Sequence, residues 1–76
     1  MTPRLPRITA AELLRALRRD GWEEVHQTGS HIQLKHSTKS GRVTVPYHRG
    51  VVLNPKTLSS VLDQASLTED ELRSLL

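Results

Sequence analysis

Cysteine and phenylalanine are both missing from this sequence of 76 residues, and each absence excludes a class of structure. Without cysteine the chain cannot form disulfides or bind a metal through thiolates, and its composition suits a reducing cytoplasm. Trp22 and Tyr47 are the only aromatic residues, which argues against a sheet that stacks RNA bases on rows of aromatic rings. No apolar run approaches the roughly 20 residues that span a membrane. We therefore expect a cytoplasmic protein that does not enter the membrane.

Residues 1–7 lack the apolar centre of a signal peptide. Pro3 and Pro6 disfavour an early helix, so we expect this segment to form a short, extended basic arm. The length of the chain predicts a single domain over residues 1–76 with one thin core.

Positive charge is concentrated in the first two thirds of the chain. Residues 1–50 contain nine Lys and Arg against four Asp and Glu, whereas residues 51–76 contain two against four. All four histidines also lie in the basic part. Such an asymmetry favours a partner rich in phosphate. The alternative is that the small net positive charge of the protein only keeps it in solution.

A first helix is predicted over residues 9–20. Thr9 and Glu12 have the spacing of a capping box, in which each side chain bonds the backbone N–H of the other residue. Gly21 can supply the left-handed residue that ends many helices. The apolar positions that recur at helical spacing are Leu13, Leu14 and Leu17.

Three strands are expected next, over residues 22–27, 32–36 and 42–45. The parity of the first strand is ambiguous, because Trp22 and Val25 cannot both face the core in a regular strand. Either a bulge lies between them or Trp22 packs from the end of the preceding helix.

Two more helices follow the strands. Asn54 is a strong N-cap, and Pro55 suits the first position of a helix over residues 55–65. Thr68, with a glutamate three residues later, forms a second capping box that predicts a short acidic helix over residues 68–76. The order is therefore α-β-β-β-α plus a terminal helix, an α+β fold with two helices on one face of a three-stranded antiparallel sheet. The expected core is Leu13, Leu17, Ile32, Leu34, Val43, Val45, Leu58 and Leu62.

His31 is the most promising candidate for chemistry. It follows a turn that contains Gly29 and Ser30, and it begins a strand whose alternate residues are apolar. Its side chain should therefore share the solvent-facing side of the sheet with Lys35. Imidazole is the side chain that changes charge near neutral pH, and this makes it suited to proton transfer. A solvated strand histidine with no function is the simpler alternative.

A histidine beside cations is a plausible arrangement for cleaving RNA without a metal. Imidazole takes the proton from the 2′-hydroxyl, and cations neutralise the charge that builds on the phosphate. The candidates for this second role are Lys35, Lys39 and Arg42. Gly29 would allow a close approach of the backbone to the ligand, and Ser30 offers a hydroxyl.

The other histidines give weaker signals. His26 and His36 each lie five residues from His31, on the opposite face of a regular strand, so the sequence predicts no metal site and no cofactor. His48, in the loop after the third strand, is a possible lining residue of the same cleft, although a solvated loop residue is the simpler reading.

The chain resembles the HicA family of bacterial toxins over most of its length. Four motifs carry the resemblance, in the order of the family: Asp20-Gly21-Trp22, Gly29-Ser30-His31, Val43-Thr44-Val45-Pro46-Tyr47-His48, and Thr57-Leu58 with Val61-Leu62 and Ala65. The resemblance implies a fold like the double-stranded RNA-binding domain. It also implies a ribonuclease that cleaves messenger RNA with an essential histidine, which is His31 here. A HicB-type antitoxin that covers the active site is the implied partner.

Two departures from the family accompany the resemblance. The family commonly has Lys-Gly-Thr-Leu before the second helix, where this chain has the residues 54–58, Asn-Pro-Lys-Thr-Leu. The family also has a glycine after the alanine that ends this helix, where this chain has Ser66. Asn54 and Pro55 provide another way to start the helix, so we expect the fold to be kept.

Two other functions are compatible with parts of the sequence. A catalytically silent RNA-binding module on the same fold would need basic residues at the start of the second helix, and only Lys56 is available there. A DNA-binding helix-turn-helix protein is disfavoured by the three strands expected between the helices.

Overall fold

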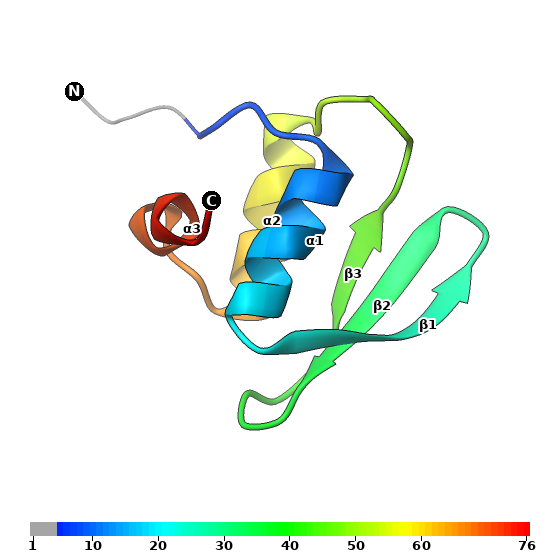
Figure 1. Cartoon of the computed structure of the whole chain (residues 1–76), viewed down its shortest axis with the longest axis vertical. Helices are drawn as coiled ribbons and strands as arrows, with labels where there is room; N and C mark the ends of the chain where they lie inside the picture. The colour runs from blue at the N-terminus through cyan, green and yellow to red at the C-terminus, as the bar shows by residue number, and fades with distance from the viewer. Residues whose placement is uncertain (1–4) are drawn as a thin grey trace.

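The computed structural model describes residues 5–76 and has the order of elements that the sequence predicts (Figure 1). The elements are α1 (Ala10–Arg19), β1 (Trp22–Thr28), β2 (His31–His36), β3 (Val43–Pro46), α2 (Pro55–Ala65) and α3 (Glu69–Leu75). The expected basic arm, residues 1–7, lies mostly outside the described residues, which begin at Leu5. None of the described helices has the length and apolar character needed to cross a membrane.

The three strands form one antiparallel sheet in which the spatial order is the chain order. Both α1 and α2 pack on the same side of this sheet (Figure 1), and a single cluster of buried side chains fills the space between the layers. The predicted core is confirmed, because Leu13, Leu17, Ile32, Leu34, Val43, Val45, Leu58 and Leu62 are all buried. We call the opposite side, which none of the described helices covers, the open face.

A bulge resolves the ambiguous parity of β1. Glu24 pairs with Leu34 of β2, but the next pair joins His26 to Gln33, so Val25 has no partner in the ladder. Trp22 is buried at the start of β1, whereas Val25 is 49% exposed, so the two residues do not both face the core. The bulge is present, and Trp22 is buried two residues after the C-cap of α1.

The bounds of β3 differ by one residue at each end from the expected range 42–45. Arg42 precedes the strand, and Pro46 is its last residue, paired with His31 of β2. Proline lacks an N–H but fits here because β3 is an edge strand and the chain leaves the sheet at this point.

Side-chain caps begin the helices as predicted. Thr9 Oγ1 accepts from the backbone N–H of Glu12, and Glu12 Oε1 accepts from the backbone N–H of Thr9 at 3.0 Å. Hydrogen bonds from the backbone and then the hydroxyl of Thr9 lower the pKa of Glu12. Asn54 caps α2 through a 2.8 Å bond from the N–H of Lys56, and Thr68 and Glu71 form the capping box of α3.

The third helix completes the core at the far end of α1. Its Leu72 is fully buried, and the guanidinium of Arg19 donates to the backbone carbonyl of Leu75. Ser66, which links α2 to this segment, has a left-handed backbone with φ +55°. This conformation favours glycine, which is the residue that the resemblance leads us to expect at this position.

Candidate active site

His31 is the first residue of β2, and its side chain is exposed on the open face of the sheet. Backbone pairing places Thr28 of β1 on one side of it and Pro46 of β3 on the other. Gly29, in the turn just before it, has φ +58°, a conformation that glycine adopts without strain. The turn therefore holds His31 at the end of the sheet, where its backbone pairs with both β1 and β3.

A groove of about 370 Å³ lies at the β3 edge of the sheet, where side chains at the end of the open face meet α2. His31, Thr44 and Pro46 form its sheet side. Its helix side consists of Lys56, Thr57, Ser60, Val61 and Gln64. The side chain of Gln64 also closes the edge of β3, because its Oε1 accepts from the backbone N–H of Thr44 at 2.9 Å. We call this feature the His31 groove.

The electrostatics of the His31 groove come from two side chains. His31 and Lys56 are the titratable residues that line it, and no carboxylate is among its lining residues. Lys56 lies in the first turn of α2, where the bond between its backbone N–H and Asn54 Oδ1 fixes the start of the helix. The groove therefore suits an anionic ligand such as a phosphate group.

The imidazole of His31 is not engaged by the rest of the protein. Within residues 5–76, no hydrogen bond or ion pair involves its ring. Both ring nitrogens are therefore available to a ligand in the groove, one as an acceptor and one as a donor in the neutral form. A proton can be accepted or donated here without breaking a structural contact.

Two of the predicted cations share the open face with His31, at different distances from it. Arg42 Nη1 donates to Gln33 Oε1 at 2.7 Å, and Gln33 is the next residue of β2 on that face. Lys35 is four residues along the strand from His31, a separation of about 13 Å. It lines another hollow, together with Glu23. Arg42 is thus the closer of the two to the groove.

Lys39 has a structural position in this protein. Its ammonium group makes an ion pair with Asp20 Oδ2 at 2.7 Å and donates to the backbone carbonyl of Ala65 at 3.0 Å. These two partners lie at the ends of α1 and α2, so Lys39 ties the second hairpin loop to both helices. It points away from the His31 groove, where the sequence analysis expected it to contribute charge.

His48 lies in a hollow next to the His31 groove. This hollow has a volume of about 280 Å³ and includes the exposed Val51 and Val52. Pro46 and Thr57 line both spaces, so the hollow and the groove adjoin. His48 is therefore near the site, but it lines the adjoining hollow and not the groove itself.

The two remaining histidines are engaged by neighbouring groups. His26 Nε2 is 2.8 Å from the hydroxyl of Thr28. His36 Nδ1 accepts from the backbone N–H of Thr38 at 3.0 Å, which leaves Nε2 to donate to the carbonyl of Asp20. Within residues 5–76, no three His, Cys, Asp or Glu side chains lie close enough together to hold a metal ion.

The polar side of α2 is the part of the groove that the sequence analysis does not assign to the site. Lys56, Ser60 and Gln64 are spaced four residues apart, so they form one stripe along the helix. This spacing is a signal that could have identified them together. Their position opposite His31 depends on how α2 packs along β3, which is a tertiary property.

The chain matches a known protein family over most of its length. A family model described as the HicA toxin of bacterial toxin–antitoxin matches residues 10–67, from the start of α1 to the segment before α3. No curated protein matches the chain. The matched segment includes His31, the whole sheet and every residue that lines the His31 groove. The chain therefore belongs to the HicA family, whose members are the toxins of bacterial toxin–antitoxin systems.

Proposed function

We propose that this toxin is an endoribonuclease that cleaves messenger RNA in the His31 groove. The observation that carries the proposal is an unengaged imidazole that shares an open groove with a lysine and with no carboxylate. This combination supplies a group for proton transfer and a fixed positive charge for a phosphate. Membership of the HicA family supports the same activity.

The chemistry requires one proton transfer at each end of the reacting phosphate. His31 removes the proton from a ribose 2′-hydroxyl, whose oxygen then attacks the adjacent phosphorus. A bond forms between O2′ and phosphorus, the bond to the 5′-oxygen breaks, and that oxygen takes a proton from the solvent as it leaves. The products are a 2′,3′-cyclic phosphate and a free 5′-hydroxyl. Neither the attack nor the departure requires a metal ion.

Lys56 has the position to stabilise the charge that develops on the phosphate. Lys56 lines the helix side of the groove, opposite the sheet side that carries His31. Fixed charges aimed at a developing negative charge act most strongly where water is partly excluded, as in a groove. Ser60 and Gln64 lie on the same stripe of α2 and offer hydrogen bonds that orient the RNA backbone.

The antitoxin partner of this toxin is proposed to be of the HicB type and to cover the His31 groove. Family membership implies an antitoxin. The groove is the natural target, because a protein seated on it would exclude RNA from the imidazole. Carboxylates of the antitoxin would face the cations of the open face, Lys35 and Arg42, and Lys56 of the groove.

Replacement of His31 by alanine tests the proposed mechanism. General acid–base groups contribute about 10²–10⁴-fold, so His31→Ala should reduce RNA cleavage by at least about 100-fold. The thermal unfolding temperature should not change, because the side chain is exposed. Lys56→Ala should also reduce cleavage, whereas His26→Ala, which removes an exposed histidine outside the groove, should not. EDTA should have no effect on the rate.

Two results would contradict the proposal. Cleavage that survives His31→Ala would remove the histidine from the mechanism, and loss of activity in EDTA would show that a metal is required. A wild-type protein that binds messenger RNA and never cleaves it would instead be the catalytically silent RNA-binding module.

A further inference from the structure

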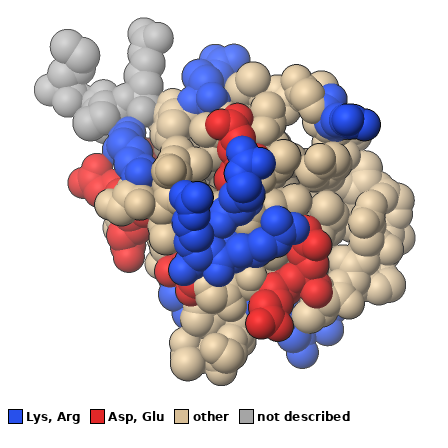
Figure 2. Space-filling model, viewed as in Figure 1, with Lys and Arg blue, Asp and Glu red and all other residues tan. Residues whose placement is uncertain are grey.

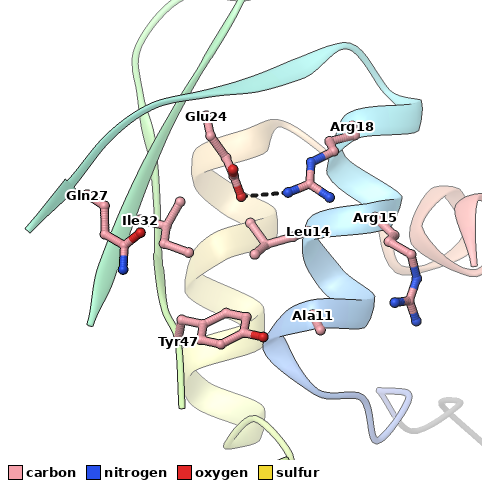
Figure 3. Close-up of a pocket in the computed structure, with 8 residues that line it drawn as sticks. All are labelled: Ala11, Leu14, Arg15, Arg18, Glu24, Gln27, Ile32 and Tyr47. Carbon is pink, nitrogen blue, oxygen red and sulfur yellow. Dashed lines mark hydrogen bonds and ion pairs between the residues drawn. The ribbon is translucent and has the colours of Figure 1, made fainter. Parts of the chain in front are cut away.

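A second cleft lies on the helix side of the sheet, between α1 and the β1–β2 hairpin (Figure 3). Its volume is about 410 Å³, which is within the range of pockets that bind small molecules. The mechanism proposed above does not use it. We call it the Tyr47 cleft, because the ring of Tyr47 forms one end of it (Figure 3).

The interior of the Tyr47 cleft is suited to a flat aromatic group. Leu14 of α1 and Ile32 of β2 are buried beneath it and present apolar surface to it (Figure 3). The half-buried ring of Tyr47 lies beside them and packs against the core. The exposed amide of Gln27 also lines the cleft; its Nε2 donates to the carbonyl of Gly29 at 3.2 Å, which leaves its second N–H and its Oε1 available to a ligand.

The rim of the cleft adds positive charge. Basic side chains gather over α1 on the face seen in Figure 2, and Arg15 and Arg18 line the cleft from that helix. Arg18 makes a 2.7 Å ion pair with Glu24, and both side chains are at least 39% exposed. Exposed pairs of this kind contribute about 0–1 kcal/mol, so a ligand can displace or share this one at little cost. Arg15 makes no ion pair within residues 5–76, and, besides the hydrogen bonds from Thr9, its charge helps to lower the pKa of the nearby Glu12.

The Tyr47 cleft and the His31 groove open on opposite faces of the same end of the sheet. Ile32 beneath the cleft directly follows His31, and Tyr47 directly follows Pro46 of the groove. The backbone N–H of Tyr47 donates to the carbonyl of Ser30 at 2.6 Å, so the two strand ends are held together. A single RNA strand that passes over this end of the sheet would reach both spaces.

We propose that the Tyr47 cleft binds an unpaired nucleotide of the same RNA strand that is cleaved in the His31 groove. The base stacks on Tyr47 above the apolar floor, Gln27 and Glu24 bond its polar edge, and Arg15 contacts its phosphate. This subsite rests on the proposed ribonuclease function and adds the requirement that the substrate is single-stranded next to the cleavage point. Duplex RNA cannot offer an unstacked base.

An acidic segment of a protein partner is the other anionic ligand that arginines attract, and the cleft fits it less well. Glu24 would repel a carboxylate inside the cleft, whereas it can accept a hydrogen bond from an amino group of a base. The aromatic ring and the buried apolar floor also add nothing to recognition of a carboxylate.

The test measures RNA binding by protein that carries His31→Ala, so that the RNA stays intact. The probe is a short, fluorescently labelled single-stranded RNA of mixed sequence, followed by anisotropy. Tyr47→Leu should weaken binding by at least about fivefold, the lower end of the contribution of one stacked base, while Tyr47→Phe should keep it. Neither change should alter the affinity for the corresponding duplex.

Arg15→Ala tests the rim without touching the core, and this keeps the experiment informative if Tyr47→Leu unfolds. The matched control is Arg7→Ala, which removes the same charge from an exposed residue outside the cleft. Arg15→Ala should weaken RNA binding more than Arg7→Ala does, and Gln27→Ala should weaken it as well.

The subsite would be overturned if Arg15→Ala and Arg7→Ala reduced RNA affinity equally and Tyr47→Leu left RNA affinity unchanged. Variants that lose affinity for the antitoxin and keep their affinity for RNA would also overturn it, in favour of a protein interface. The ribonuclease proposal has a separate readout, because a wild-type protein that cleaves no RNA contradicts that proposal whatever these binding measurements show.

Discussion

Substitution of Gly21 by alanine should destabilise the protein through a contact that the backbone conformation makes unavoidable. Gly21 has φ +106°, and a Cβ built on it would lie 2.6 Å from Nε2 of His36. The ring cannot move away freely, because Nε2 is bonded to the carbonyl of Asp20 and Nδ1 accepts from the N–H groups of Thr38 and Lys39.

The expected cost has two parts. Alanine in a left-handed conformation costs roughly 1–2 kcal/mol. Displacement of the His36 ring weakens one or two hydrogen bonds, which contribute about 1 kcal/mol each. The free energy of unfolding should therefore fall by about 2–4 kcal/mol, and the unfolding temperature of a domain of this size should fall by roughly 10–25 °C.

Thermal and urea unfolding of four variants, Gly21→Ala, Gly41→Ala, His36→Ala and the double variant with Gly21→Ala and His36→Ala, separates the two parts. Gly41→Ala is the matched control, because Gly41 has φ +81° and no atom lies within 4 Å of its would-be Cβ. It should show the backbone cost alone. In a His36→Ala background the ring is gone, so Gly21→Ala should cost about as much as Gly41→Ala does. If Gly21→Ala and Gly41→Ala are equally stable in the wild-type background, the proposed clash with His36 is wrong.

Three further predictions concern stability and binding. Ser66→Gly should raise the free energy of unfolding by about 0.5–1 kcal/mol, because glycine adopts the left-handed backbone of this position without strain. Urea titrations measure this change, and a loss of stability would contradict it. Because Thr9 lowers the pKa of Glu12, the carboxylate stabilises α1 above the ordinary pKa of glutamate, and this contribution is lost as the pH falls through the lowered value. The stability difference between wild type and Glu12→Gln should therefore be present at pH 7 and shrink in acid; a difference that is independent of pH would refute the argument. Binding of the antitoxin should weaken as salt rises, because exposed charges are screened over about 8–10 Å at physiological ionic strength, whereas an affinity independent of salt would exclude an electrostatic interface.

Local features of the fold could be predicted from the sequence. The caps at Thr9, Asn54 and Thr68 join residues two or three positions apart, so their spacing in the sequence carries the whole signal. The alternation in β2 likewise identified its buried side chains and the exposed side chain of His31. Each of these predictions depends on the geometry of one helix end or one strand.

Features that depend on packing between distant segments could not be predicted in the same way. Lys39 is 19 positions from Asp20 in the sequence, and its ion pair depends on where a loop meets the ends of two helices. His31 and Lys56 lie on opposite sides of one groove because α2 packs along the edge of β3. Charge composition counts the basic residues, but it cannot identify a lysine whose contacts support the fold, as those of Lys39 do.

The agreement between strand order and chain order bears on how this protein folds. Each strand pairs with the strand next to it in sequence, and only Gly29 and Ser30 separate β1 from β2. Short loops cost little entropy to close, so the sheet should assemble early and rapidly. The contact between Arg19 and Leu75 spans 56 positions, and loop closure over that distance is slower and more costly. We therefore expect α3 to dock last, against a sheet and an α1 helix that are already formed.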